Sequence, residues 1–400
     1  MASALAYPQF RRLWTSSLCS WLAQWIQQAS MGWVVYEITG SGALLGAVMG
    51  VRVLPLLLLA PISGVAADRF NRRRLLQASQ LLAASVSFAI GIALALGMVS
   101  TWMLFAFTLL MGAANVMDRP ARFSTVFELV PRDVAMKAVA LNTIGFSMMR
   151  IIGPAIAGYL IAWFGAAGSF LIQGVLYGSA ALLVLAVAFP PPRAPSGRTA
   201  MADMLEGLRF AARDPRMRIL ITIGALPYLL LVPVWGTLFP IYAKDEFLAG
   251  PQGLGMLLTA VGLGGTLGGF IANALVRAER QALIQSGWIV LMALSIVGLA
   301  ASPSIAAALA FGFIGGAAEM AHTASNMATL QMCAPEDMRG RIASLTMMYP
   351  AMISTGAFLA GPLSDLLGVR GASTTLALVS LAAVGVLYFV APQLREMRIK

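Results

Sequence analysis

Two arginines, Arg52 and Arg150, lie deep within long apolar stretches of the sequence. At the helical rise they lie about 15 Å and about 20 Å from an end of their stretches, too far for easy snorkelling. Because charges are costly in hydrocarbon, both should face a watery cavity or a carboxylate. They could bind an anionic substrate, or they could instead be hydrogen-bonded to the backbone, to Asp118 or to Glu37.

A second set of polar residues lies three to four positions apart in another apolar stretch: Glu319, His322 and Asn326. This spacing places them on one helical face. Burial favours the neutral form of a carboxyl group, and imidazole titrates near neutrality, so Glu319 or His322 could carry a proton. The alternative is a satisfied polar pair that pins this helix to a neighbour.

A polar and aromatic stripe is formed by Trp21, Gln24, Trp25 and Gln28. Such a stripe would be unusual against lipid, so we expect it to line a cavity, although helix packing would also explain it. Indole rings and amides suit a large ligand with aromatic or cationic parts. We expect further ligand contacts from Asn115, Tyr228 and Asn326.

The elements that must position these residues are membrane-spanning helices. Apolar runs near or above the roughly 20 residues needed to span a bilayer recur along the chain. They predict an all-α membrane protein with 12 transmembrane helices, at residues 13–36, 42–66, 75–97, 101–123, 137–163, 168–190, 217–243, 252–276, 282–301, 304–331, 342–364 and 371–391.

The composition excludes most other classes of protein. The 400 residues are 59% hydrophobic with a mean hydropathy of +0.83, and only 11% are charged. One histidine and 16 acidic residues leave little material for a hydrolytic or metal site. The two cysteines, Cys19 and Cys333, lie in different halves, so we expect neither a disulfide nor a metal site. No cofactor and no catalytic residues are expected.

The net charge of +11 does not indicate nucleic-acid binding, because of where the charges fall. In this topology all but four of the 27 Lys and Arg residues lie in cytoplasmic segments. This asymmetry predicts that both termini are cytoplasmic and that the chain attracts anionic membrane lipid. Arg11 and Arg12 precede a full-length span, which indicates a retained first helix and not a cleaved signal peptide.

A linker and an internal repeat divide the chain into two bundles. Residues 190–216 begin with a proline-rich stretch and continue as a short amphipathic helix, expected on the inner membrane surface. Residues Gly112, Pro131 and Asp133 recur 204 positions later, and Gly158 and Gly165 recur 203 positions later. We therefore predict two pseudo-symmetric six-helix bundles, at residues 1–189 and 217–400.

The loop after the second span reads Gly64-Val-Ala-Ala-Asp68-Arg69-Phe-Asn-Arg72-Arg-Arg. This pattern resembles the loop 2–3 signature of the major facilitator superfamily. The resemblance implies alternating access. In that cycle Asp68 would engage the start of the eleventh predicted span, residues 342–364, when the inner side is closed. The inner gate residues expected on this basis are Gly64, Asp68, Arg69, Arg72, Asp118, Arg122, Arg339 and Arg341.

Two further patterns resemble parts of that superfamily. Gly153, Pro154 and Gly158 partly match the helix 5 signature of its antiporters, which mostly export. The stretches Asp118-Arg-Pro-Ala-Arg122, Leu208-Arg-Phe210 and Pro335-Glu-Asp-Met-Arg-Gly-Arg-Ile342 resemble the enterobactin-exporter and macrolide-efflux branch.

These observations favour a secondary active transporter in a bacterial inner membrane. We expect it to be a monomer that uses the proton gradient to export an amphiphilic small molecule, such as a siderophore or drug, anionic if the arginines bind it. The alternative is a lipid or lysophospholipid transporter, since an apolar, methionine-rich cavity suits acyl chains. A membrane enzyme lacks the clustered acid, base and nucleophile it needs, and a receptor would not need the intramembrane charges.

Overall fold

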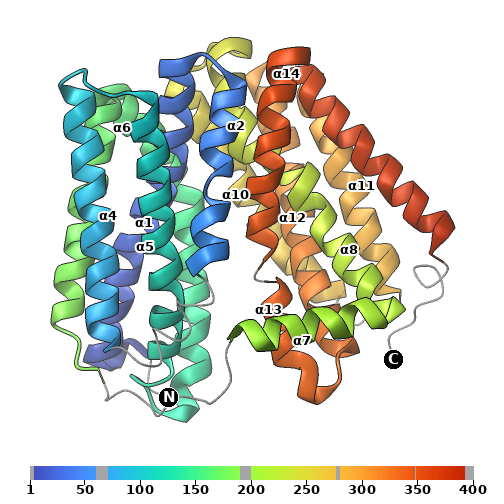
Figure 1. Cartoon of the computed structure of the whole chain (residues 1–400), viewed down its shortest axis with the longest axis horizontal. Helices are drawn as coiled ribbons and strands as arrows, with labels where there is room; N and C mark the ends of the chain where they lie inside the picture. Colours follow the sequence, from blue (N-terminus) through green and yellow to red (C-terminus); the bar gives the residue numbers. More distant parts are fainter. Residues whose placement is uncertain (1–3, 60–70, 190–199, 276–279, 347, 392–400) are drawn as a thin grey trace. The chain divides into compact units, whose positions relative to one another are not determined.

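The computed structural model describes residues 4–59, 71–189, 200–275, 280–346 and 348–391. Within these ranges the chain forms helices and turns, with no β-strand (Figure 1). Nine of the described helices are long and apolar enough to cross a membrane. Large apolar side chains are widely exposed along them, including Trp102, Trp163 and Phe270. The prediction of an all-α membrane protein is therefore confirmed.

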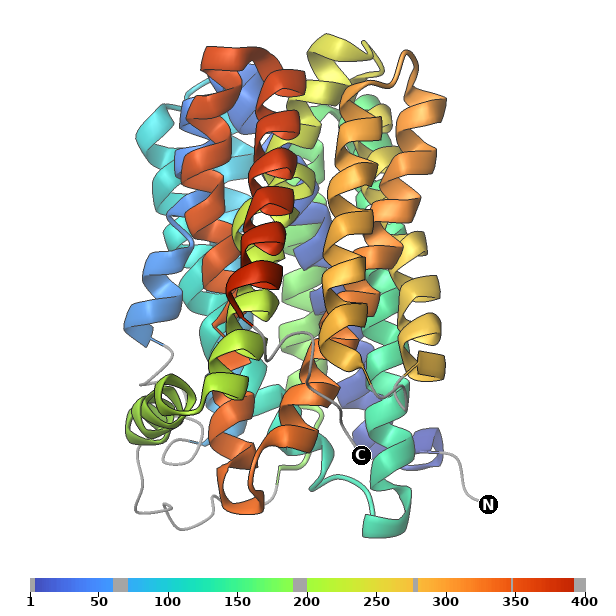
Figure 2. The same cartoon turned by 90° about the vertical axis from the view of Figure 1, so that its right-hand side faces the viewer.

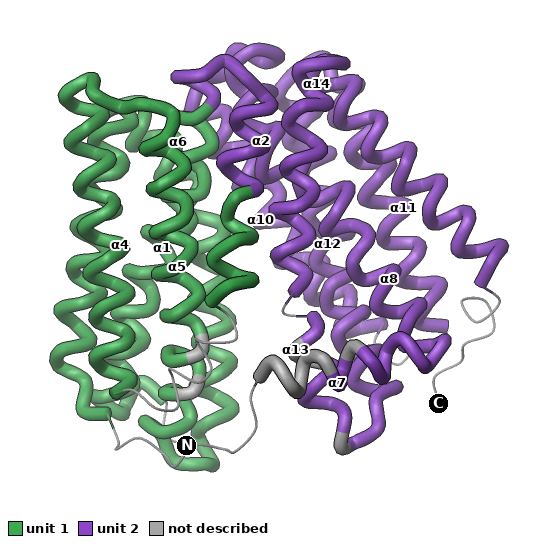
Figure 3. The backbone as a smooth tube through the Cα atoms, in the orientation of Figure 1, with its two compact units in different colours: residues 1–35, 51–200 green, residues 36–50, 201–400 purple. Residues whose placement is uncertain are grey.

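The chain divides into two compact units (Figure 3). Unit 1 contains residues 1–35 and 51–200, and unit 2 contains residues 36–50 and 201–400. Residues 36–50 thus belong with the second unit although they precede the linker in sequence. The linker stretch 190–199 lies outside the described residues.

Unit 1 is built from long helices that join at an apolar core near one end, where Phe10, Leu13, Leu76 and Val126 are buried. Its helices are η1 (Ala4–Ala6), most of α1 (Pro8–Thr39), α4 (Arg72–Ala95), α5 (Thr101–Val126) and α6 (Arg132–Leu185).

Unit 2 holds the remaining helices, of which α7 runs across the ends of the long ones. They are α2 (Gly42–Gly50), α7 (Ala200–Arg213), α8 (Pro215–Leu230), η2 (Val234–Leu238), α9 (Phe239–Ile241), η3 (Tyr242–Glu246), α10 (Gly250–Leu275), α11 (Gln281–Ala300), α12 (Ile305–Cys333), η4 (Glu336–Met338), α13 (Arg339–Thr346) and α14 (Tyr349–Val390).

The twelve predicted spans fall largely on helices where their residues are described, apart from a turn at residues 51 and 52 and a few residues at span ends. Helices α6 and α14 each carry two of the spans, joined at a glycine. Gly165 has φ 68° and Gly368 has φ 71°, so both bends use the left-handed backbone region that favours glycine. These two glycines are the pair predicted from the internal repeat, and they make the same bend in the two halves of the chain.

The second predicted span is interrupted near its middle. Residues 51 and 52 form a turn between α2 and a helical stretch at 53–59. Pro55 accounts for the break, because its ring clashes with the carbonyl four residues earlier and it has no N–H to donate. The Val51 carbonyl accepts instead from the Leu54 amide at 3.0 Å. Arg52 therefore lies at a break in a spanning helix.

The seventh predicted span is also irregular. Helix α8 contains Pro227 and ends at Leu230, and the π-helical segments η2 and η3 follow. Pro233 has no N–H for the Leu229 carbonyl, which lies against Gly356 of α14. The two prolines thus lie where the α-helical pattern is interrupted, and π-helical turns often accompany functional sites.

Helices α10 and α12 lie in close contact along a row of glycines. A Cβ at Gly264 would lie 1.9 Å from the Phe313 carbonyl oxygen, and a Cβ at Gly268 would lie 2.0 Å from that of Ala317. Small residues allow this approach, which replaces the hydrophobic driving force that is absent between helices in lipid.

We expect Gly268→Ala to lower the melting temperature of the purified protein by about 3 °C or more, since overpacking costs about 1–3 kcal/mol. The neighbouring Gly269→Ala is the matched control, because its Cβ would lie 3.7 Å from Met320 Cγ, an ordinary contact. Thermal unfolding in detergent measures both. Equal melting temperatures for the two variants would contradict the assigned packing.

Candidate functional site

An aromatic cluster with one guanidinium lies between α1 and α6 in unit 1. The Trp21 and Trp25 rings lie 5.7 Å and 5.8 Å from the Phe146 ring, between centroids. The Arg150 guanidinium lies over the Trp25 ring, 5.9 Å from its centroid. Trp21, Trp25 and Arg150 are all half-buried. The stripe predicted on the first helix is therefore brought together with one of the two intramembrane arginines.

Small residues on α6 make this arrangement possible. A Cβ at Gly153 would lie 2.5 Å from Trp25 Cβ, and one at Gly145 would lie 3.0 Å from Leu18 Cδ2. A larger residue at Gly153 would therefore push the two helices apart, and one at Gly145 would require the Leu18 side chain to shift. Pro154 and Gly158 are buried in the same helix. The antiporter-like signature thus positions Trp25 in this structure.

Three more predicted ligand contacts are half-buried in unit 1. Gln24 and Gln28 form no hydrogen bond with another residue in the described part of the chain, so their amides remain available. Asn115 donates through Nδ2 to the Met111 carbonyl at 3.0 Å, which leaves its Oδ1 atom as a possible acceptor for a ligand. Arg52 likewise has no ion pair among the described residues and lies within electrostatic range of Arg119 and Tyr177.

A buried ion pair joins Asp118 and Arg122 of α5. Arg122 donates through Nε and Nη2 to the two carboxylate oxygens at 2.9 Å and 3.0 Å. Gln80 of α4 donates to Asp118 Oδ1 at 2.8 Å, and Arg122 also donates to Ser17 of α1 at 3.0 Å. These bonds tie three helices of unit 1 together. Asp118 is thus bonded to Arg122 and Gln80, and not to Arg52.

In unit 2, a half-buried polar group forms between α8 and α12. The Tyr228 and Thr323 hydroxyls share a hydrogen bond of 2.7 Å, and Thr323 donates to the Glu319 backbone carbonyl at 2.8 Å. Tyr228 also stacks on Tyr349 with ring centroids 5.1 Å apart. Glu319 is half-buried on the same helix as Thr323.

His322 and Asn326 lie differently from Glu319. Asn326 is 1% exposed, and its amide accepts from the Tyr349 hydroxyl and donates to Gln285 Oε1 and the Leu220 carbonyl. His322 is 2% exposed, with Nδ1 3.2 Å from the Gln285 carbonyl oxygen. These bonds hold α12 to α8 and α11, whereas the buried Nε2 atom of His322 has no hydrogen-bond partner among the described residues. The roles predicted for His322 in proton transfer and for Asn326 in ligand binding stay predictions.

The predicted inner gate is only partly described. Gly64, Asp68 and Arg69 lie outside the described residues. The engagement of Asp68 with the start of the eleventh predicted span, at residues 342–364, therefore stays a prediction. Arg72 forms a buried ion pair with Glu128. Arg341 pairs with Glu206 of α7 at 2.8 Å, and Arg339 lies 3.8 Å from Glu336.

A contact between α2 and α14, the α2–α14 seam, was not predicted from the sequence. Glycines at 42 and 46 of α2 lie against the backbone of α14 around Ala357 and Gly361. The Asp365 carboxylate accepts from the backbone amides of Gly42 at 2.6 Å and Ala43 at 2.9 Å. It therefore caps the N-terminus of α2, where a negative charge is favourable.

Charged residues cluster beside this seam. Tyr36 donates to Asp245, the Lys244 ammonium lies 5.3 Å from the Tyr36 ring centroid, and Arg370 Nε donates to Glu246 at 2.6 Å. Acidic residues at the outer ends of otherwise apolar spans are the sequence signal for this charged cluster.

Comparison with known proteins identifies the family. The profile of the transmembrane secretion effector family matches residues 2–399. The chain belongs to this family of major facilitator transporters. It is 28% identical over 382 residues to the multidrug efflux pump Tap of Mycolicibacterium fortuitum, covering 91% of each chain. It is 23% identical to the staphyloferrin A transporter of Staphylococcus aureus, covering 95% of this chain and 96% of the relative.

The fold of this transporter agrees with a solved structure as well. A bacterial homologue of the human lysosomal transporter Spinster superposes with a TM-score of 0.79 at 14% identity, covering 98% of both chains. The family match and the bacterial relatives show that the protein is a small-molecule transporter of the plasma membrane, and not an enzyme. The predicted family and its efflux branch are confirmed.

We expect Arg122→Gln to lower the melting temperature of the transporter strongly, because removing one partner of a buried ion pair costs about 3–5 kcal/mol. In Asp118→Asn/Arg122→Gln no uncompensated charge remains, so part of the loss should be recovered. Thermal unfolding of the two single variants and the double variant measures the coupling. Additive losses would show that the two side chains act independently.

Proposed function

We propose that the protein exports an amphiphilic small molecule by alternating access, driven by the proton gradient. Its relatives carry efflux and siderophore-transport names, which supports export. The observation that carries the substrate class is the position of Arg150 over the Trp25 ring, beside Phe146. Aromatic faces bind large apolar groups, and the guanidinium selects an anionic or polar end.

The amides of Gln24 and Gln28, which form no hydrogen bond with another described residue, extend this cluster along α1. They lie one turn or less from Trp21 and Trp25 and supply both donors and acceptors. A substrate with several carbonyl or hydroxyl groups on an aromatic or aliphatic frame would satisfy them. Siderophores and macrocyclic drugs both have this chemistry.

The substrate class can be tested by ligand-induced stabilisation of the purified transporter. Carboxylate siderophores, macrolides and lysophospholipids are added separately, and a ligand of the native state raises the melting temperature. We expect stabilisation by a siderophore or drug. A shift with lysophospholipids alone would instead favour the lipid-transport alternative.

For the bound ligand, we expect Trp25→Ala and Arg150→Gln each to weaken binding by at least about 10-fold, since a desolvated cation–π or charge contact is worth about 2 kcal/mol. Trp163→Ala is the matched control, because Trp163 is 72% exposed on the apolar surface. Titration of the melting temperature gives the affinities. Unchanged affinity in both test variants would contradict this site.

We assign proton coupling to Glu319. It is the intramembrane carboxyl group of α12 and lies half-buried on the same helix as Thr323, which shares a hydrogen bond with Tyr228. A carboxyl group that changes between charged and neutral forms can link a proton to a conformational change.

Glu319→Gln mimics the protonated form, so we expect substrate binding to persist while transport loses its dependence on the pH gradient. Proteoliposomes with an imposed gradient measure this dependence, and Glu336→Gln, an exposed acid in η4, is the control. Wild-type transport with an unchanged response to the gradient would exclude Glu319 as the coupling residue.

Alternating access also needs a contact that opens on the outer side, and we assign this role to the α2–α14 seam. Its glycines pack backbone to backbone, so the seam can close tightly, and few side-chain bonds besides those of Asp365 hold it. Loss of the carboxylate charge weakens its interaction with the N-terminus of α2.

We therefore expect Asp365→Asn to increase opening of the seam. Leu45 is fully buried on α2, so a Leu45→Cys variant lacking Cys19 and Cys333 reports opening by its reaction with an impermeant maleimide. Labelling should be several-fold faster with Asp365→Asn than without it. Equal labelling rates would show that Asp365 does not hold the seam closed.

A further inference from the structure

Four arginines gather where α7 meets α8: Arg209, Arg213, Arg216 and Arg218. All four side chains are exposed, and none has an ion pair with another residue in the described ranges. The transport site proposed above does not use them. So many unpaired guanidiniums within ten residues attract anionic groups strongly.

Helix α7 lies crosswise to the long helices of unit 2. It is seen from the side in Figure 1 and end-on in Figure 2. The Glu206–Arg341 ion pair holds it to α13, and a Cβ at Gly207 would lie 2.9 Å from the Arg341 carbonyl oxygen. Gly207 and Ala211 face the protein, whereas Arg209 and Arg213 are exposed. This is the placement expected of an amphipathic helix at a membrane surface.

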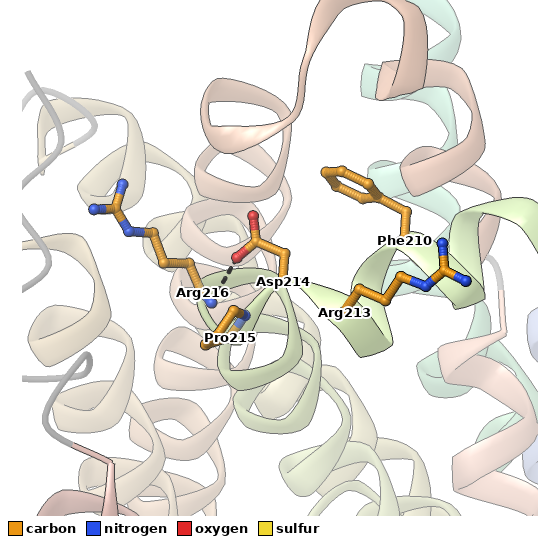
Figure 4. Close-up of a pocket in the computed structure, with 5 residues that line it drawn as sticks. All are labelled: Phe210, Arg213, Asp214, Pro215 and Arg216. Carbon is orange, nitrogen blue, oxygen red and sulfur yellow. Dashed lines mark hydrogen bonds between the residues drawn. The ribbon is translucent and has the colours of Figure 1, made fainter.

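An open pocket lies at the junction, lined by Phe210, Arg213, Asp214, Pro215 and Arg216 (Figure 4). The Asp214 carboxylate caps α8 and accepts from the amides of Arg216 at 2.7 Å and Met217 at 3.3 Å. Its charge is therefore engaged by the start of the helix. In Figure 4 the guanidiniums of Arg213 and Arg216 point to opposite sides of the pocket, so each presents a separate cationic group beside the apolar side chains of Phe210 and Pro215.

We propose that the basic corner around this pocket binds the phosphate headgroups of anionic membrane phospholipids, with Arg213 and Arg216 each able to hold one phosphate. Guanidinium groups match phosphate oxygens with two parallel hydrogen bonds, and the apolar walls suit the glycerol and first acyl carbons. A surface helix joined to a spanning helix places the pocket at headgroup depth, which favours a lipid over a free anion. Bound lipid would fix the corner between α7 and α8, independently of the transported substrate.

The test compares the transporter in nanodiscs of phosphatidylcholine alone and of phosphatidylcholine mixed with phosphatidylglycerol. We expect phosphatidylglycerol to raise the melting temperature of the wild type, and Arg213→Gln/Arg216→Gln to lose more than half of that rise. The control, Arg132→Gln/Arg280→Gln, removes the same charge from two other exposed arginines and should keep the rise. Equal melting temperatures of all three proteins in phosphatidylcholine would show that the substitutions leave the fold intact.

Two outcomes would overturn the proposal. An equal rise in all three proteins would mean diffuse attraction to the charged surface and no site at this pocket. Stabilisation by inorganic phosphate in phosphatidylcholine nanodiscs, as large as that by phosphatidylglycerol, would assign the pocket to a free anion. Native mass spectrometry gives a second measurement, in which the wild type and the control should retain phosphatidylglycerol and the Arg213→Gln/Arg216→Gln variant should not.

Discussion

A charge within a membrane span must be paired or must reach a polar space, and this constraint organises the protein. Asp118 and Arg122 satisfy it by pairing in a network that ties α1, α4 and α5 together. Arg150 lies over the face of Trp25 and stays half-buried, as does Glu319 beside Thr323. The buried pair builds structure, and the two half-buried groups are the ones that we propose for the ligand and the proton.

The helices were predictable because a span needs only length and apolar composition, both of which can be read directly from the chain. The irregular backbone at Pro233 was predictable too, because proline always lacks the N–H donor, whereas the repeat identified Gly165 and Gly368 as a pair without predicting their bends. The α1 stripe predicted a cavity-lining face, and the structure adds its partners Phe146 and Arg150 on α6.

Contacts between distant segments were not predictable in the same way. Asp365 caps a helix 323 positions away, and no local pattern signals that meeting. Helical spacing placed Glu319, His322 and Asn326 on one face, but it could not show that α8 and α11 cover the last two. Which residues of a helical face are buried depends on the helices that pack against it. One sequence read by itself does not specify those neighbours.

The break caused by Pro55 has a consequence for how forces pass along the chain. Unit 1 resumes at Val51, so the covalent crossing between the units falls at an interruption in the helix, whereas the crossing at residues 35 and 36 lies inside α1. A continuous helix transmits torque along its axis, but two residues outside helical geometry contribute four soft dihedral angles. The crossing at Val51 and Arg52 is therefore the more flexible of the two, and it places the Arg52 side chain at that flexible point.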